Sequence, residues 1–235
     1  MRSHGKIATG FCGANKTPRD NEGVFVAQPA ERWVVHKFGG SSLADADCFR
    51  RVAAIVEGLG EPRIALVLSA CQGVTDQLIQ LVTLAERNED AALTAALDRL
   101  RLRHERIATE LLAADARQAF LATLRADLAD LQRLLQAVAL VRSAGRDLQD
   151  RVAGFGELWS SRLFADFLSG RGGRDPVRWL DARKIIVVEW GALGPGVQWG
   201  PSQSHAAECV PSDARTLVVP GFVATDTRGL QTTLG

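Results

Sequence analysis

The stretch "VVHKFGGSSLADADCFRRV" (residues 34–52) joins a short apolar run to a segment with helical spacing through a turn of glycine and serine. We expect "WVVHKF" (33–38) to form a buried-type strand and a helix to follow from Asp45 onward. That helix would carry four apolar side chains on one face: Phe49, Val52, Ala53 and Val56. A strand, a glycine turn and a helix in this order are typical of one βα unit in a parallel sheet.

The turn of this unit carries groups that suit a phosphate. Gly39 and Gly40 follow the strand at the carboxyl edge of the sheet, where doubly wound α/β folds open their binding crevice. They permit a tight turn and let a ligand approach the main chain closely. Ser41 and Ser42 offer hydroxyl and N–H groups near a helix N-terminus, where an anion is stabilised. Lys37 adds a compact positive charge, which suits a transferring phosphoryl group.

An ordinary connection between a strand and a helix, with one exposed lysine, explains the same stretch without any ligand. The stretch matches neither GxxxxGK[ST] nor GxGxxG, so it carries no P-loop or Rossmann fingerprint. Taken alone, it leaves both interpretations open.

A second junction of this kind follows the apolar strand expected over "RIALVLSA" (63–70). If the two strands are neighbours, the loop between Ser69 and Thr75 adjoins the first turn. Thr75 precedes a helix expected over 76–87 and could serve only as its N-cap. Its hydroxyl could equally bind the carboxylate of a substrate.

The third stretch is "AGFGELWSSRLF" (153–164), inside a helix expected over 151–169. Gly154 and Gly156 precede Glu157, which we place in the first turn of that helix. The helix dipole stabilises a carboxylate there without any ligand. The glycines would also leave room around a fixed carboxylate, which could bind a substrate ammonium. Together the three stretches suggest phosphate at one junction and a zwitterion at the other.

The remaining sequence predicts a helical insertion and further strands. Residues 90–143 contain no strand-like run and repeat leucine at spacings of three and four, so we expect a helical hairpin bent near 113–117. The later elements are expected in this order: a short strand over 177–183, a long surface loop over 191–213, a strand over 216–224 that returns to the sheet, and a hairpin turning at Arg228–Gly229. Residues 1–32 have no periodicity and predict a flexible tail, which leaves 33–235 as one domain.

Composition narrows the class of protein. With 235 residues, 46% of them hydrophobic, the chain can bury one sizeable core. The net charge of +1 gives no electrostatic reason to expect nucleic acid or a membrane surface as partner. The four cysteines, Cys12, Cys48, Cys71 and Cys209, have no CxxC or Cys/His pairing, so we expect neither a metal site nor a disulfide framework. No segment has the length of an export signal or a membrane span, and we expect a cytoplasmic protein.

Four motifs resemble the aspartate kinases of the amino-acid kinase family, in which they occur in the same order. They are "HKFGGSSLADA", "VLSACQGVTDQL", "GFGELWSSRLF" and "LVVPGFVATDTRGLQTTLG". The first looks most like the kinase half of bifunctional aspartokinase/homoserine dehydrogenases. The similarity covers residues 33–235 apart from the long loop, and four ordered motifs are far more specific than one.

The resemblance implies a three-layer αβα sandwich around a mainly parallel sheet, truncated here and with a helical hairpin insertion. ATP and aspartate would bind along the carboxyl edge of that sheet. The roles implied residue by residue are a catalytic lysine that stabilises the γ-phosphoryl group (Lys37), a phosphate loop (Gly39, Gly40 and Ser41), a serine near the phosphoryl path (Ser69), and an aspartate site (Thr75, Glu157 and Phe222). Glu157 would face the α-ammonium of aspartate, whereas Phe222 could equally be a packed core residue.

The implied reaction is attack of the aspartate side-chain carboxylate on the γ-phosphorus of Mg-ATP. It gives 4-phospho-L-aspartate and ADP, the entry step to lysine, threonine and methionine biosynthesis. A carboxylate is already ionised at pH 7, so no strong general base is needed. Positioning and charge neutralisation by Lys37, backbone amides and Mg²⁺ would carry catalysis. The resemblance also implies a homo-oligomer for the full-length protein.

One departure from the family bears on activity. In the family, "TTLG" is followed by Arg-Gly-Gly-Ser-Asp, whereas the present sequence stops at Gly235. We therefore expect a partial kinase domain with little or no aspartate kinase activity on its own. Two other interpretations stay open: a different amino-acid or carbamate kinase of the same fold, and a non-catalytic remnant.

Overall fold

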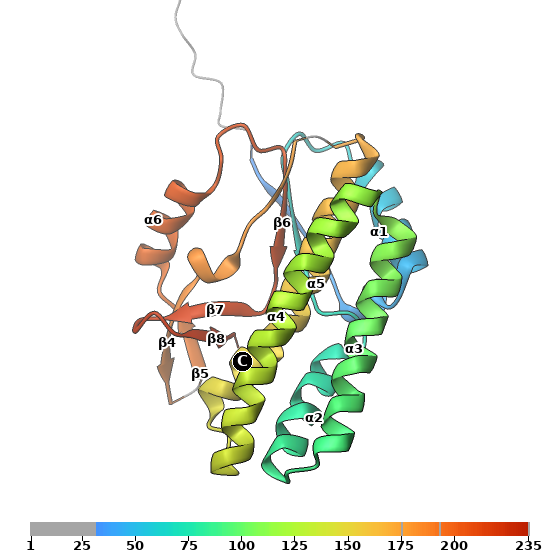
Figure 1. Ribbon diagram of the computed structural model, residues 1–235. Coiled ribbons are helices and arrows are strands. Elements are labelled where there is room, and N and C mark those ends of the chain that lie inside the picture. Colours follow the sequence, from blue (N-terminus) through green and yellow to red (C-terminus); the bar gives the residue numbers. More distant parts are fainter. Residues whose placement is uncertain (1–31, 175, 193, 235) are drawn as a thin grey trace, which may run out of the picture. The chain divides into compact units, whose positions relative to one another are not determined.

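A computed structural model describes residues 32–174, 176–192 and 194–234 of the chain (Figure 1). The tail expected over residues 1–32 lies outside the described residues, apart from Arg32. The first strand begins at Val34, beside the expected start of the folded part at Trp33.

The first sheet, sheet A, has four strands, and every neighbouring pair is parallel. In spatial order the strands are β1 (Val34–Phe38), β2 (Ile64–Leu68), β6 (Thr216–Pro220) and β3 (Val177–Trp179). The inner strand β2 is a continuous apolar run, as is usual where both faces of a parallel strand are covered. The expected α/β class with a parallel sheet is confirmed, and the two βα units are neighbours.

Helices α1 (Ala46–Glu57) and α5 (Arg146–Arg171) pack together, and α5 lies against β2, β6 and β3 of sheet A. The rings of Phe49 and Phe164 lie 5.9 Å apart between their centroids. Helix α1 begins where the sequence predicts, because the Asp45 carboxylate accepts a hydrogen bond from the Cys48 amide at 2.9 Å. All four apolar residues expected on its inner face are buried.

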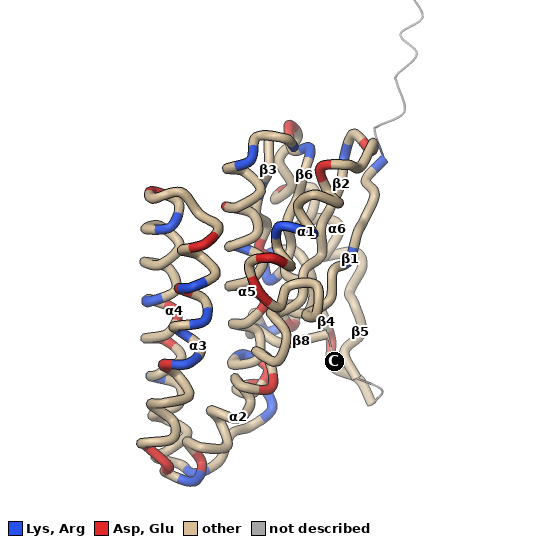
Figure 2. Tube along the Cα trace, turned by 90° about the vertical axis from the view of Figure 1, so that its right-hand side faces the viewer, with Lys and Arg blue, Asp and Glu red and all other residues tan. Residues whose placement is uncertain are grey.

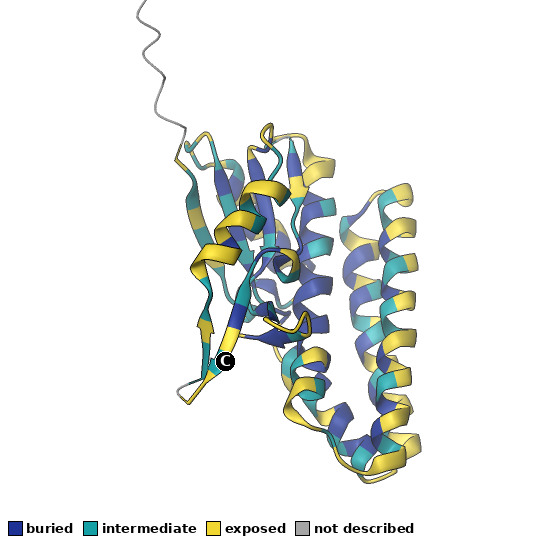
Figure 3. Ribbon diagram, turned by 90° about the vertical axis from the view of Figure 1, so that its left-hand side faces the viewer, coloured by how far each residue is buried: buried dark blue, intermediate teal, exposed yellow. Residues whose placement is uncertain are grey.

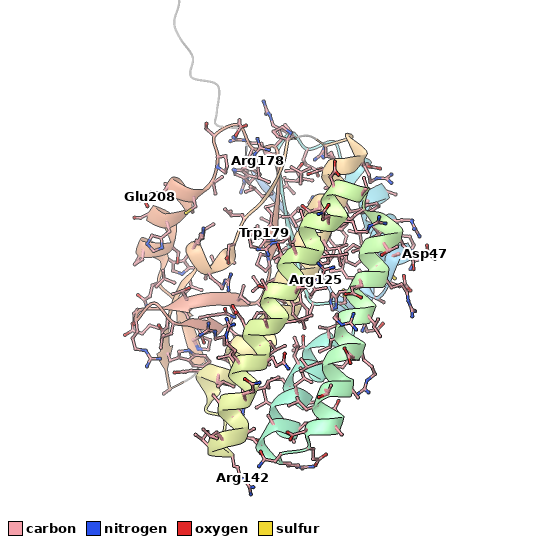
Figure 4. The ribbon with its side chains drawn as sticks, in the orientation of Figure 1. Asp47, Arg125, Arg142, Arg178, Trp179 and Glu208 are labelled. Atoms are coloured by element: carbon pink, nitrogen blue, oxygen red, sulfur yellow. The ribbon has the colours of Figure 1, made fainter. Side chains whose placement is uncertain are left out.

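Helix α5 is also fixed to the far edge of sheet A. Trp179 of β3 donates from Nε1 to the Ser161 hydroxyl at 2.9 Å, and the Arg162 guanidinium lies 4.3 Å from the centre of its ring. Figure 4 shows Trp179 beside this helix. A buried indole nitrogen needs such a partner, so this contact fixes the lateral position of α5.

The predicted helical hairpin is confirmed, with α3 (Asp90–Leu111) and α4 (Ala114–Val141) following α2 (Val74–Glu86). Figures 2 and 3 both place α3 and α4 on the side of α5 away from the strands. Their buried residues turn inward and their exposed residues outward, as the leucine spacing predicts (Figure 3). The hairpin therefore adds a second helical layer outside α1 and α5.

One polar side chain, His104, is fully buried in this helical layer. Its Nδ1 lies 2.8 Å from the Leu100 carbonyl oxygen, and its ring meets Trp159 edge to face at 5.0 Å between centroids. Nε2 has no hydrogen-bond partner among the described residues. Because a carbonyl accepts only from a protonated nitrogen, the proton of the neutral ring sits on Nδ1. Burial lowers the pKa of His104 from 6.5 to about 4.

We expect His104 to make the fold sensitive to acid. Folding lowers the pKa of His104 from 6.5 to about 4, so the unfolded chain binds a proton more readily than the folded chain. The free energy of unfolding is therefore unaffected above pH 6.5 and decreases as the pH falls from 6.5 towards 4. The full change corresponds to about 3 kcal/mol in the free energy of unfolding. Urea unfolding of wild type and His104→Leu at pH 7 and pH 4.5 measures it. The wild type should lose more free energy than the variant, and equal losses would contradict this role.

The second sheet, sheet B, was not expected from the sequence. Its strands in spatial order are β5 (Gly194–Val197), β4 (Val187–Gly191), β7 (Val223–Asp226) and β8 (Gln231–Thr233). The β4–β7 pair is parallel and the other two pairs are antiparallel. The hairpin expected at Arg228–Gly229 is confirmed between β7 and β8, where Gly229 has φ +82° and its amide donates to the Asp226 carbonyl at 2.9 Å.

The bounds expected for two strands in this part of the chain were wrong. The strand expected over 177–183 ends at Trp179, and a short 3₁₀ helix, η2 (Ala182–Lys184), follows it. The strand expected over 216–224 breaks at Gly221, so β6 joins sheet A and β7 joins sheet B. A Cβ at Gly221 would lie 2.7 Å from Val67 Cγ1, so only glycine lets the chain cross this point.

The long loop expected over 191–213 instead contains β5 and helix α6 (Trp199–Cys209). The glycine, proline and serine of this segment favour a loop, yet Pro201 falls in the first turn of α6. Its missing N–H leaves no helical hydrogen bond unmade there. Ser202 is buried and its hydroxyl accepts from the Val187 amide at 3.0 Å, which ties α6 to β4.

No helix in the described ranges is long and apolar enough to cross a membrane.

Candidate functional site

Three strands of sheet A end side by side, and the segments that follow them define the candidate site. The parallel register pairs Phe38 with Leu68 and Leu68 with Pro220. The Ser69 amide then donates to the Phe38 carbonyl at 3.1 Å, and the Gly221 amide donates to the Leu68 carbonyl at 2.9 Å. The carboxyl edge of β1, β2 and β6 is therefore a single rigid rim, as in other open α/β sheets that bind ligands there.

Glu157 of α5 reaches this rim and is 6% exposed. Its carboxylate accepts a hydrogen bond from the Phe222 amide. Burial is the main influence on its pKa, which is raised from 4.5 to about 7. The amides of Phe222, Gly221 and Ala70 and the charge of Lys37 oppose that rise. Glu157 is thus a buried carboxyl group that titrates near neutral pH, and perturbed groups of this kind cluster at functional sites.

The placement of Glu157 in a first helical turn was wrong. Helix α5 begins at Arg146, several residues before the expected start at residue 151, so Glu157 lies well inside it. The dipole effect falls off within the first turn and therefore does not explain a carboxylate at this position. Side chains of sheet B contact the additional turns at the start of α5. The Arg146 guanidinium lies 3.8 Å from the centre of the Trp190 ring, and Asp150 accepts from the Thr232 hydroxyl at 2.9 Å.

The two glycines before Glu157 serve helix packing. A Cβ at Gly156 would lie 2.9 Å from both Ala70 Cβ and Val74 Cγ1, and a Cβ at Gly154 would lie 2.8 Å from Val223 Cγ1. The space expected for a ligand around these glycines is therefore filled by protein. One turn further, the Ser160 hydroxyl donates to the Ser69 carbonyl at 2.7 Å. Through these contacts α5 packs against the end of β2, and this packing fixes the position of Glu157.

We expect Gly156→Ala to lower the free energy of unfolding by about 1–3 kcal/mol, because its methyl group overpacks the contact with α2. Gly170→Ala is the matched control on the same helix, since a Cβ there would meet nothing within 4 Å. Alanine also favours a helix over glycine, so the control should keep or slightly raise stability. Chemical denaturation measures both variants, and equal stabilities would contradict the close contact.

The proposed phosphate loop forms a short 3₁₀ helix, η1 (Gly40–Leu43). A Cβ at Gly40 would lie 2.8 Å from the Ala70 carbonyl oxygen, so the loops after β1 and β2 touch. At Gly39 a Cβ would meet no atom within 4 Å, which leaves the main chain open to a ligand. Ser41 is exposed in η1. Ser41 and Ser42 lie within η1, which leads into the N-terminus of α1, and Asp45 caps α1.

Ser41 and Ser42 line a cavity of about 300 Å³ together with Arg51. Lys37 is not among the residues that line it. Lys37 is exposed on β1, and its charge acts on Glu157. The charge of Lys37 therefore reaches Glu157, whereas Ser41 and Ser42 line a cavity that Lys37 does not line.

The structure bears on the alternative interpretations of Thr75 and Phe222. Gly73, with φ +74°, is the N-cap of α2, and Thr75 is its second residue, so Thr75 is not the N-cap. Its neighbour Val74 packs against Gly156, which places Thr75 near the Glu157 turn. Phe222 is partly exposed and belongs to neither apolar core cluster of the described residues. A packed core phenylalanine is therefore the poorer interpretation of Phe222.

Sequence reasoning missed one residue at this rim. Arg103 of α3 donates from Nη1 to the Gln72 carbonyl at 2.8 Å and from Nη2 to the Ala44 carbonyl at 2.9 Å. It thus spans the two loops that carry the candidate residues. The only trace in the sequence is the recurrence of arginine along one face of α3, at Arg99, Arg103 and Arg106.

No group of three or more His, Cys, Asp or Glu side chains in the described part of the chain could hold a metal ion. The cysteines that the structure describes, Cys48, Cys71 and Cys209, are free thiols.

A parallel sheet whose carboxyl rim carries an open glycine turn, a lysine and a buried carboxyl group defines an α/β protein with a candidate site for a charged small molecule. Comparison with known proteins gives the family. The sequence model of the amino acid kinase family matches residues 32–235, and the chain belongs to that family.

Proteins that this chain is similar to include aspartokinases. Bifunctional aspartokinase/homoserine dehydrogenase 1 of Zea mays is 32% identical over 206 residues, which cover 87% of this chain and 22% of that protein. Bifunctional aspartokinase/homoserine dehydrogenase 2 of Escherichia coli is 34% identical over 203 residues, covering 86% of this chain and 24% of that protein. The crystal structure of E. coli aspartokinase III in complex with aspartate and ADP has a TM-score of 0.76 at 28% identity. It aligns with 87% of this chain, which spans 44% of that structure's length.

Proposed function

We propose that this chain forms the aspartate-binding side of an aspartate kinase, which transfers the γ-phosphoryl group of ATP to the side-chain carboxylate of L-aspartate. In this proposal Lys37 is the catalytic residue, and Gly39, Gly40, Ser41 and Ser69 contact the phosphates. Thr75, Glu157 and Phe222 bind aspartate. Residues 33–235 belong to the kinase domain, whose longer form is a homo-oligomer. The products are 4-phospho-L-aspartate and ADP.

The observation that carries the proposal is the buried Glu157 at the rim of sheet A, whose carboxylate accepts a hydrogen bond from the Phe222 amide and is influenced by the charge of Lys37. A buried carboxyl group beside a lysine suits a substrate that carries both an ammonium and a carboxylate. The aspartate and ADP of the solved E. coli relative agree with such a substrate pair. The chain spans about a quarter of the length of these curated relatives.

The proposed chemistry needs positioning and charge neutralisation more than acid–base catalysis. One side-chain oxygen of aspartate attacks the γ-phosphorus, the bond from that phosphorus to the β–γ bridging oxygen breaks, and ADP leaves with the bond electrons. The attacking carboxylate is ionised at pH 7, so no proton has to be removed. Lys37 would stabilise the charge of the transferring group, and Glu157 would hold the unreacting ammonium.

The turn after β1 fits the phosphates of a nucleotide. The open space at Gly39 lets an anion approach backbone N–H groups. Lys37 is the second-last residue of β1, close to the same rim. We propose that Mg²⁺ accompanies the nucleotide, because this ion is usually bound through substrate phosphates together with one or two carboxylates. When bound there, Mg²⁺ supplies charge neutralisation for the phosphate oxygens.

Competition between amino acids tests the substrate. Calorimetric titration of the chain with L-aspartate should give saturable binding, and L-glutamate should bind about 10-fold or more weakly because one extra methylene displaces the reacting carboxylate. As a control, Asp166→Asn removes a carboxylate of α5 other than Glu157. This variant should leave aspartate binding unchanged. Equal affinity for both amino acids would favour another acceptor within the family. No binding of either would favour a non-catalytic role.

A further inference from the structure

Two loops of the proposed site are joined by one side chain from the helical hairpin. Arg103 of α3 is half-buried, and its guanidinium donates to the Ala44 carbonyl at 2.9 Å and to the Gln72 carbonyl at 2.8 Å. Ala44 ends the η1 turn, which carries the proposed phosphate loop. Gln72 precedes Gly73, which begins the helix that carries Thr75.

The two loops already touch at one point. A Cβ at Gly40 would lie 2.8 Å from the Ala70 carbonyl oxygen and 3.5 Å from the Gln72 Cα. The contact is made between backbone segments without a side chain at Gly40 to interlock them. Arg103 therefore supplies the side-chain hydrogen bonds that join the loop after β1 to the loop after β2 on this side.

The helix backbone and the guanidinium group both favour a fixed position for the Arg103 side chain. Leu100, His104 and Ile107, on neighbouring turns of α3, are buried in the core, so the helix backbone at Arg103 is rigidly packed. The planar guanidinium can donate two hydrogen bonds in fixed directions, whereas a lysine ammonium is a point charge on a flexible stem. Hydrogen bonds from a charged donor are also stronger than neutral ones.

The neighbouring arginines on this face differ from Arg103. Arg99 and Arg106 line the same cavity of about 560 Å³ beside α1, but neither makes a hydrogen bond or ion pair among the described residues. Arg101 forms ion pairs with Asp98 and Glu105 inside α3, and its hydrogen bonds among the described residues go to the same two side chains. The bridge is thus specific to Arg103.

We propose that Arg103 is a positioning residue, which holds the phosphate-loop turn and the Thr75 loop at the separation that the aspartate and phosphate sites require. The proposal rests on the proposed function. It gives the helical hairpin a role in the site, because α3 sets the distance between two loops of the sheet rim. Arg103 acts through the Ala44 and Gln72 carbonyls and does not touch the reacting atoms.

Hydrogen exchange on the whole chain tests the positioning without any substrate. In Arg103→Ala, amides of residues 39–45 and 70–76 should exchange about 10-fold or more faster than in wild type, since two charge-assisted hydrogen bonds are lost. Amides of α4 should be unchanged. Arg99→Ala and Arg101→Ala are the controls, and neither should alter exchange in the two loops.

Two results of the exchange experiment would overturn the proposal. Unchanged exchange in both loops would show that they hold their positions without Arg103. Equal acceleration in the loops and α4 would show that Arg103 only attaches the hairpin to the rest of the fold. If Arg103→Ala does not fold, Arg103→Lys provides the test, because a lysine can restore one carbonyl contact and should accelerate exchange by a smaller factor.

Aspartate titration separates this proposal from the proposed function. We expect Arg103→Ala to weaken aspartate binding about 10-fold, with partial recovery in Arg103→Lys and no change in Arg99→Ala. If wild type binds aspartate and Arg103→Ala binds it equally well, Arg103 does not position the site although the proposed function stands. If wild type binds no aspartate but both loops loosen in Arg103→Ala, the proposed function fails and Arg103 still holds the loops.

Discussion

Lys37→Ala should lower kcat for aspartate phosphorylation by about 100- to 1000-fold, measured in a form of the protein that contains a complete kinase domain. The KM for aspartate should remain nearly unchanged. The reason is that Lys37 would act on charge that develops on the transferring phosphoryl group, so its loss affects the transition state more than the bound substrate. Steady-state kinetics with varied aspartate at saturating Mg-ATP measure both constants.

Two further variants sharpen this prediction. Lys184→Ala removes another lysine, which is exposed in η2, and should leave both constants unchanged. Lys37→Arg keeps the positive charge but replaces a compact ammonium with a planar group, so it should recover only part of kcat. A raised KM for aspartate with unchanged kcat in Lys37→Ala would show that the lysine binds substrate without stabilising the transfer.

Glu157→Ala should show the opposite pattern, with a loss of aspartate affinity of about 30-fold or more. Its proposed partner is the α-ammonium of aspartate, which does not react, so weaker binding should dominate over any change in kcat. Calorimetry on wild type, Glu157→Ala and Glu157→Gln measures the affinity, with Asp166→Asn as the control on the same helix. If Glu157→Gln binds aspartate as tightly as wild type, Glu157 does not bind the substrate ammonium. Its role is then limited to accepting the hydrogen bond from the Phe222 amide.

The same carboxyl group should shape the pH dependence of stability. A carboxyl group whose pKa rises on folding, here from 4.5 to about 7, favours the folded state below its unfolded pKa and loses that contribution as pH rises through 7. The full change corresponds to about 3 kcal/mol. Glu157→Gln should therefore show a smaller loss of unfolding free energy than wild type between pH 5 and pH 8.

The first two βα units were predictable because their patterns are local. A continuous apolar run, a glycine turn and the Asp45 cap lie next to one another in the sequence, and each specifies its own element. The helical hairpin was predictable for the same reason, since its leucines repeat with the helical period. The sequence around Glu157 left a ligand-binding role and a helix-dipole role open, and the family resemblance implied the first; the structure adds the burial of Glu157 and its neighbours at the rim.

The features that sequence reasoning missed depend on contacts between distant segments. Helix α5 begins early because Trp190 and Thr232 of sheet B contact its first turns. Helix α6 forms although its composition favours a loop. A hydrogen bond from the Val187 amide to the Ser202 hydroxyl joins it to β4. Arg103 was missed because it binds backbone carbonyls, which any residue supplies, so its partners leave no pattern in the sequence.

Proton release on aspartate binding tests the central claim most directly. With a pKa of about 7, Glu157 is about half protonated at pH 7, and an ammonium bound beside it would favour the ionised form. Titrations in buffers of different ionisation enthalpy should show that wild type releases up to about half a proton per aspartate at pH 7, and that Glu157→Gln releases none. Saturable aspartate binding without proton release in wild type would contradict the placement of the substrate ammonium at Glu157.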